Sequence, residues 1–118
     1  MANTEKRKNF STNLDKELLR KIKIIAADFE KNQNEIIEEG ISLVVREITD
    51  SMLYGKLITI NESDNRKLKN TTIDRKLHKK LNQIKARTDI NINTLIEEGL
   101  RKIIKKYKDK YTKGAKSL

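Results

Sequence analysis

Hydrogen-bonding side chains recur at every second position of two short segments, residues 8–14 and 67–73. The set consists of Asn9, Ser11, Asn13, Asn70 and Thr72, with Leu68 at the remaining equivalent position. They alternate with residues such as Phe10, Leu14 and Ile73. A period of two places the two kinds of residue on opposite faces of a β-strand. Because amides and hydroxyls both donate and accept hydrogen bonds, the polar faces predict recognition by hydrogen bonding.

Bond-breaking chemistry is not predicted. The chain contains no cysteine and a single histidine, His78, so it offers neither a thiol nucleophile nor a cluster of metal ligands. The sequence contains no recognisable nucleophile–base pair and no glycine-rich phosphate loop. We therefore expect a protein that is not an enzyme and has no cofactor or metal. We expect His78 to be an exposed helix residue without a role.

The net charge of +10 is distributed unevenly. Residues 1–50 contain 9 Lys/Arg and 10 Asp/Glu, a net charge of −1, whereas residues 51–118 contain 18 and 7, a net charge of +11. Such an excess predicts a polyanionic partner, nucleic acid before a membrane. No apolar run approaches the roughly 18–20 residues of a transmembrane helix, and no apolar segment follows the basic N-terminus as in a signal peptide. We expect a cytoplasmic protein.

The sequence repeats itself at a spacing of 59 residues without a gap. The phrase "NEIIEEG" at 34–40 matches "NTLIEEG" at 93–99, and Asp15 matches Asp74. Units of this size rarely fold alone, so the two copies should bury their apolar faces against each other. The predicted organisation is a flexible arm, a first unit, a linker, a second unit and a basic tail, at residues 1–7, 8–48, 49–66, 67–107 and 108–118.

Each unit predicts a strand followed by two helices. Asp15 and Asp74 are the expected N-caps of the first helices, which carry apolar stripes at spacings of three and four and end near residues 29 and 88. The second helices have a wider apolar face, which indicates burial on more than one side. Their expected N-caps are Asn32 and Asn91.

Three positions depart from this regular pattern. A glycine inside a helix costs about 1 kcal/mol against alanine, so Gly40 and Gly99 predict a close approach of the second helices. Lys69 falls on the core side of its strand, which predicts an edge-like or frayed start of that strand. The alternating stretch 55–63 predicts an extra short strand or a packed linker.

Strand, helix and helix, with a polar outer strand face, resemble the ribbon-helix-helix family of DNA-binding proteins (the Arc, MetJ and CopG type). The stretches that carry the resemblance are "NTTIDRKLHKKLNQIKARTDININTLIEEGLRKII" (70–104) and "STNLDKELLRKIKIIAADFEKNQNEIIEEGISLVV" (11–45). The resemblance implies a mainly α-helical fold with a short two-stranded antiparallel ribbon, formed by two tandem copies as an intramolecular pseudo-dimer. Family members usually have a glycine between the helices, where this chain has Glu30 and Asp89. Either that turn is strained or an asparagine takes the left-handed conformation.

The resemblance also implies which residues contact double-stranded DNA. A two-stranded ribbon enters the major groove, where bases would be read by Asn9, Ser11, Asn13, Leu68, Asn70 and Thr72. Phosphates would be contacted by Arg7, Lys8, Asn32, Gln33, Asn34, Arg66, Lys67, Asn91 and Asn93. Because the two strands differ, we expect an asymmetric target, with further copies of the chain on adjacent sites. The lysines of the C-terminal segment are either a solvated face or non-specific phosphate contacts.

The resemblance leaves the biological role open. Two fused units are similar to TraY-like relaxosome accessory proteins, which implies a plasmid-type regulator or a relaxosome factor at an origin of transfer. Its partner would be a relaxase or another transfer protein. A chromosomal transcriptional repressor or autoregulator is the alternative. An antitoxin would need an apolar tail, which "KDKYTKGAKSL" (108–118) lacks, and a basic RNA-binding helical protein is a further alternative.

Overall fold

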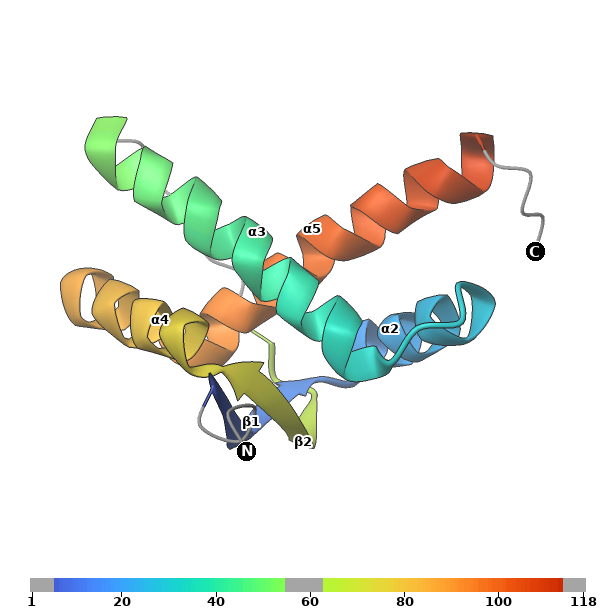
Figure 1. Ribbon diagram of the computed structural model, residues 1–118, viewed down its shortest axis with the longest axis horizontal. Coiled ribbons are helices and arrows are strands. Elements are labelled where there is room, and N and C mark those ends of the chain that lie inside the picture. The colour runs from blue at the N-terminus through green and yellow to red at the C-terminus, as the bar shows by residue number, and fades with distance from the viewer. Residues whose placement is uncertain (1–5, 55–62, 114–118) are drawn as a thin grey trace.

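The computed structural model describes residues 6–54 and 63–113. Helices predominate and two strands pair in one antiparallel sheet, as the sequence predicts. The elements in chain order are β1 (Arg7–Asp15), α2 (Lys16–Asp28), α3 (Gln33–Tyr54), β2 (Arg66–Asp74), α4 (Arg75–Thr88) and α5 (Ile92–Lys113). Figure 1 shows α3 and α5 crossing above the two strands, with α4 and α2 on opposite sides. Within the described ranges, no helix is long and apolar enough to cross a membrane.

The two strands form a ribbon that is centred on a pair of equivalent residues of the sequence repeat. Ser11 lies opposite Asn70, the residue 59 positions later, and the pairing extends four residues to either side. Each strand is one residue longer at both ends than the predicted segments 8–14 and 67–73. At the centre of the ribbon, Ser11 of the first unit is therefore paired with Asn70, the equivalent residue of the second unit.

An aspartate caps the first helix of each unit, as predicted. The Asp15 carboxylate accepts the Leu18 N–H at 3.0 Å, and the Asp74 carboxylate accepts the Lys76 N–H at 2.8 Å. Such a cap contributes about 1 kcal/mol of stability. Ser63 also donates its hydroxyl to Asp15 at 2.6 Å, and this bond is the main cause of the lowered pKa of Asp15. Asp15 thus fastens the residue stretch before β2 to the start of α2.

The second helices begin near their predicted caps but run further than expected. The Asn32 N–H donates to the Glu35 carboxylate at 3.3 Å, the reciprocal half of a capping box. α5 continues to Lys113, past the predicted unit end at residue 107. Its last turns are held by Tyr111, whose ring packs edge-on against a phenylalanine of the other unit and whose hydroxyl donates to Asp28. Burial, and after it this hydrogen bond, raises the pKa of Tyr111 to about 12.

The segments between and before the units differ from their predicted bounds. α3 reaches Tyr54, well inside the predicted linker 49–66, and β2 already begins at Arg66. The extra strand expected at 55–63 falls almost wholly outside the described residues. So does most of the predicted arm, but its last residue, Arg7, belongs to β1.

The corner between the helices takes a left-handed conformation at the residues where the family usually has glycine. Glu30 has φ 54° and Asp89 has φ 60°. Of the two expected alternatives, the structure therefore has the strained turn and not a left-handed asparagine. The position is set by the end of the first helix, where the Lys31 N–H donates to the Ala26 carbonyl at 2.9 Å and closes the turn.

Glycine at either corner is expected to stabilise the protein. A left-handed non-glycine residue costs about 1–2 kcal/mol, whereas glycine loses about 0.5–1 kcal/mol more backbone entropy on folding. Glu30→Gly and Asp89→Gly should each raise the free energy of unfolding by about 0.5–1 kcal/mol in urea titrations. Gln83→Gly, at an exposed site inside α4, is the control, and it should lower the free energy of unfolding by about 1 kcal/mol. A similar loss at both corners would contradict the argument.

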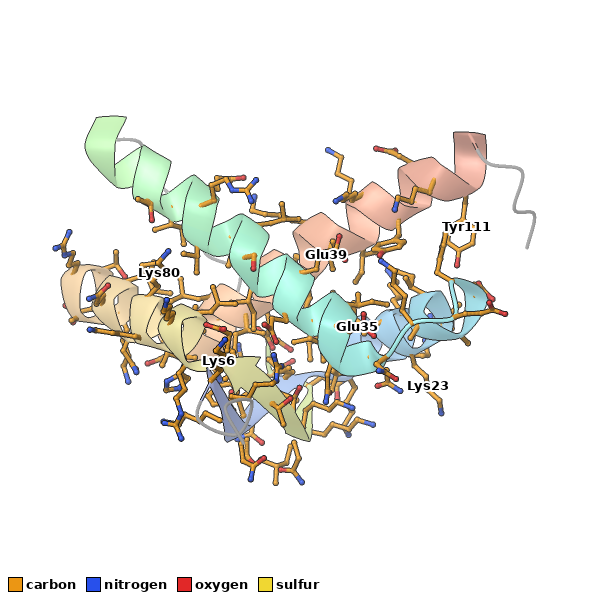
Figure 2. The ribbon with its side chains drawn as sticks, in the orientation of Figure 1. Lys6, Lys23, Glu35, Glu39, Lys80 and Tyr111 are labelled. Atoms are coloured by element: carbon orange, nitrogen blue, oxygen red, sulfur yellow. The ribbon has the colours of Figure 1, made fainter. Side chains whose placement is uncertain are left out.

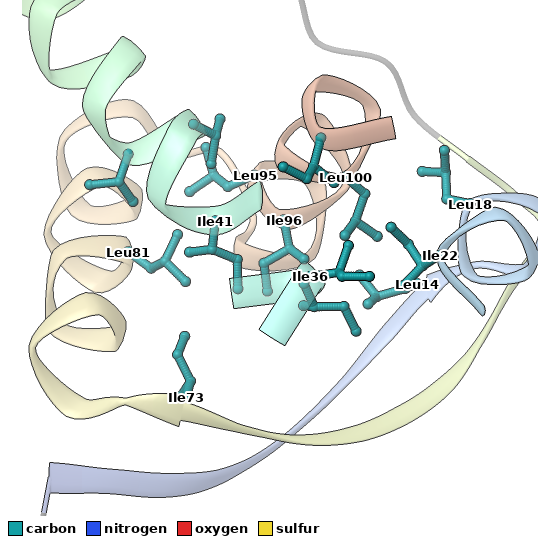
Figure 3. Packing of buried hydrophobic residues seen from close by; sticks show 14 of the residues in the cluster. Leu14, Leu18, Ile22, Ile36, Ile41, Ile73, Leu81, Leu95, Ile96 and Leu100 are labelled. Carbon is teal, nitrogen blue, oxygen red and sulfur yellow. The ribbon is translucent and has the colours of Figure 1, made fainter. Parts of the chain in front are cut away.

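Both units contribute to one hydrophobic core. Figure 3 shows the inner face of the ribbon, through Leu14 and Ile73, packed beneath residues of the second helices. The fully buried large side chains come from both strands and all four helices: Leu14, Ile22, Ile36, Ile37, Ile41, Ile48, Ile73, Leu81, Leu95, Ile96, Leu100 and Tyr107. Burying a side chain of this kind contributes about 1.5–3 kcal/mol. The outward face of the ribbon is thus fixed in position by the core beneath it.

The two second helices meet at their glycines, as predicted. A Cβ atom added to Gly40 would lie 2.7 Å from the backbone oxygen of Gly99, a distance that real Cβ atoms do not show. The Cβ of any other residue would therefore force α3 and α5 apart at their crossing point.

Candidate nucleic-acid interface

The predicted base-reading residues share one outward face of the ribbon. Directly opposite residues of an antiparallel pair lie on the same face, and the register places Asn9 opposite Thr72, Ser11 opposite Asn70 and Asn13 opposite Leu68. Five of the six side chains are exposed and Thr72 is half-buried. The sequence-based assignment of these residues to one surface is thus consistent with the register.

Some of these groups are already engaged within the protein. The Ser11 hydroxyl donates to the Asn70 side-chain oxygen, and Arg7 donates to the Thr72 hydroxyl at 3.1 Å. Within the described residues, no hydrogen bond engages the side-chain amides of Asn9 and Asn13. Leu68 is 61% exposed, an unusual position for a large apolar side chain, and lies at one end of this otherwise polar face. The face offers free amides at one strand and an apolar contact at the other.

A groove of about 790 Å³ lies beside the ribbon at the N-terminus of α3. The predicted phosphate contacts Asn32, Gln33 and Asn34 line it. Lys69 donates to the Gln33 side-chain oxygen at 3.0 Å, and the Thr71 hydroxyl donates to the Asn34 side-chain oxygen at 2.7 Å. The start of β2 is therefore not frayed, because the long side chain of Lys69 carries its ammonium out of the core to α3.

The equivalent end of α5 is less charged. Asn91 is exposed there, and the Asn93 side-chain oxygen accepts the Thr94 N–H at 2.9 Å. The lysines beside α3, at positions 31 and 69, correspond by the 59-residue repeat to Ile90 and Phe10. The two flanks of the ribbon therefore differ in charge, although they share the same backbone arrangement.

The chain matches no known protein family, no curated protein and no solved structure. The candidate site therefore rests on its own geometry. No group of His, Cys, Asp and Glu in the described ranges is placed to hold a metal ion.

Two arginines predicted to contact phosphates form ion pairs with glutamates of the second helices. Arg66 donates to both carboxylate oxygens of Glu97, at 2.8 and 2.7 Å, and Glu97 is fully buried. Arg7 forms an ion pair with Glu38, and the hydrogen bond between the two side chains is the main cause of the raised pKa of Arg7. The sequence analysis missed both glutamates. The signal was present, because in each copy the glutamate follows its arginine by 31 residues.

Two further predicted phosphate contacts lie on the opposite face of the ribbon. Lys8 and Lys67 are paired with the core residues Ile73 and Leu14, so they belong to the core-facing side, near the two ends of the ribbon. His78 is half-buried and packs edge-on against a phenylalanine of β1, with ring centroids 5.1 Å apart, so the expectation that it is exposed is wrong. Burial, and after it the charge of Lys8, lowers the pKa of His78.

Tyr107 holds Lys31 at the mouth of the α3 groove. The Lys31 ammonium donates to the Tyr107 hydroxyl at 3.0 Å, and this hydroxyl donates to Glu39 at 3.2 Å. The contact with Tyr107 is the main cause of the raised pKa of Lys31. The repeat gave no signal for this bond, because the equivalent residue of Tyr107 is Ile48.

Proposed function

We propose that this chain is a sequence-specific double-stranded DNA-binding protein that inserts the β1–β2 ribbon into the major groove. The observation that supports it is the register, which gathers six predicted base-reading side chains on one outward face. A two-stranded ribbon fits the major groove, where all four base pairs differ in their donors and acceptors. Asn9, Asn13 and Asn70 suit adenine edges, and Leu68 suits a thymine methyl group.

We further propose that one chain supplies both halves of a ribbon-helix-helix dimer. This is supported by the pairing of Ser11 with its own copy, by the contact between the two glycines and by the single core. With Ser11→Cys and Asn70→Cys in one chain, oxidation should give a crosslink within the monomer, as judged by mass on non-reducing gels. Crosslinks that form only between chains would contradict the intramolecular pairing.

Phosphate contacts should come chiefly from the α3 groove. Its lysines and the free N–H groups at the start of the helix suit a backbone phosphate. Asn91 and Asn93 offer the same helix start without a lysine beside it. Arg66 leaves the proposed contact set, because Glu97 binds its guanidinium on two nitrogens. We therefore expect the protein to prefer an asymmetric site over a palindrome.

The proposal is tested by base-reading variants. After selection of a target from random duplexes, Asn13→Ala and Asn70→Ala should each weaken binding to that target by about 1–3 kcal/mol, roughly 5- to 150-fold. Binding to unrelated duplex should hardly change, because the phosphate contacts remain. Ile24→Ala, at an exposed site on α2, is the control and should bind both duplexes like the parent. Equal losses on both duplexes would exclude base reading at these positions.

The proposed setting is the cytoplasm, as a plasmid-type regulator or a relaxosome accessory factor, with chromosomal repression as the alternative. A regulator binds at promoters, whereas a relaxosome factor binds beside a nick site and recruits a relaxase. Footprinting on the DNA around its own gene distinguishes them by the location of the protected sites. Competition between duplex DNA and RNA tests the alternative of RNA binding.

A further inference from the structure

We propose that α4 binds the DNA that flanks the ribbon, on one side of the target only; this inference rests on the proposed function. Among its 14 residues, α4 carries six basic and no acidic residues. They are all exposed and form what we call the α4 basic face: Arg75, Lys76, Lys79, Lys80, Lys85 and Arg87. In the part of the chain that the structure describes, none of them takes part in an ion pair.

This concentration of charge is unfavourable unless an anion is bound. Arg75 and Lys79, and likewise Lys76 and Lys80, are four residues apart, and like charges at this spacing repel each other on a helix. A polyanion relieves the repulsion and releases its own counterions. A phosphate backbone therefore fits the charge of this helix.

The α4 basic face continues outward from the ribbon. His78 packs against Phe10 of β1, so the side of α4 that carries His78 adjoins the ribbon. Arg75 and Lys85, three residues before and seven after His78, lie on that side of the helix. Figure 2 shows Lys80 on the other side, above α4, where it lines a shallow pocket with residues of α3. Basic side chains thus lead from the edge of the ribbon along the helix.

The equivalent helix of the first unit does not offer the same surface. α2 has four basic and two acidic residues, a net charge of +2 against +6 for α4. Its Arg20 is already paired with Glu17 at 2.7 Å, and its last residue is Asp28. Since α2 and α4 lie on opposite sides of the ribbon (Figure 1), additional phosphates would be held on one side.

The length of α4 determines how many base pairs of flanking DNA the helix can contact. Its 14 residues span about 21 Å at ~1.5 Å per residue, which corresponds to about six base pairs at ~3.4 Å each. Contacts of this kind carry no sequence information, so they should appear as salt-dependent affinity for flanking DNA of any sequence.

The test compares Arg75→Gln/Lys79→Gln/Lys85→Gln with Lys16→Gln/Lys21→Gln/Lys23→Gln. Both triple variants remove three exposed basic residues, from α4 and α2 respectively, so they change the net charge equally. Each is titrated with the selected target, first with long flanks and then trimmed to the site itself. On the flanked duplex, the α4 variant should reduce the slope of log K against log salt by about 2–3, since each lost phosphate contact removes about 0.9. The α2 variant should reduce it by less than about 1.

On the trimmed duplex the α4 variant should match the parent, and removing only one of the two flanks should abolish its difference. Equal effects of the two variants, or an equal effect on flanked and trimmed duplex, would overturn the inference. An α4 variant that binds every duplex like the parent would assign the face to another anion, such as an acidic protein. These outcomes leave specific binding intact, whereas failure of the parent to select any target would overturn the proposed function as well.

Discussion

Replacing Gly99 with alanine should lower the free energy of unfolding by about 3 kcal/mol, and leucine should leave the chain unfolded. Alanine has the higher helix propensity by about 1 kcal/mol, so the loss must come from packing. An added Cβ would lie 2.7 Å from the carbonyl carbon of Gly40 and 3.1 Å from the Ile41 nitrogen. These are backbone atoms, which cannot rotate away like a side chain. α3 and α5 would have to separate, and the core between them would lose contacts.

The reciprocal variant gives a second, independent measurement. Gly40→Ala should cost a similar amount, because its Cβ would lie 2.7 Å from the Gly99 oxygen. The stability lost in the double variant should be smaller than the sum of the two single losses, by about 1 kcal/mol or more. The reason is that the first alanine already separates the helices. Ser42→Ala, on the same helix and half-exposed, is the control and should cause no loss. Strict additivity in urea titrations would show that the two glycines do not share one contact.

The elements of this fold could be predicted because local signals agree with the repeat. Asp15 and Asp74 cap their helices, and the alternation in 8–14 and 67–73 gives both strands within one residue. The outward face follows from the same alternation, because a period of two assigns every side chain to a face. The glycine pair was predictable for a different reason. Glycine weakens a helix, so its presence at two equivalent helical positions must be explained by a contact in the tertiary structure.

The parts that could not be predicted depend on contacts between the two copies. Lys31 and Tyr107 come from different units, and neither residue recurs in the other copy, so the repeat carries no signal for their hydrogen bond. The left-handed corner is set by the carbonyls at the end of the first helix, and Glu30 itself gives no local signal for it. The length of α5 depends on Tyr111, whose partners are Asp28 at the end of α2 and Phe29, the C-cap of that helix.

Glu97→Gln should lower the free energy of unfolding by about 3 kcal/mol, because it removes the negative charge that binds the Arg66 guanidinium in a largely buried site. Glu97 is fully buried, and the Arg66 side chain is 19% exposed. Glutamine keeps the shape and can still accept the Asp15 N–H, which Glu97 binds at 2.8 Å. The expected loss therefore reports the missing charge and not a cavity. Urea titrations of the parent and the variant, with unchanged slopes, provide the measurement.

The equivalent pair in the first unit provides the matched control. The side chains of Arg7 and Glu38 are 41% and 23% exposed, so water screens their attraction and Glu38→Gln should cost about 1 kcal/mol or less. Arg66→Met combined with Glu97→Gln should recover most of the stability, since it removes both charges of the buried pair. If Arg66 is structural, as its two bonds to Glu97 indicate, the double variant should also keep the parent's salt dependence of DNA binding. A slope reduced by about 0.9 would instead assign Arg66 to a phosphate. Equal losses for Glu38→Gln and Glu97→Gln would show that burial does not decide the strength of these pairs.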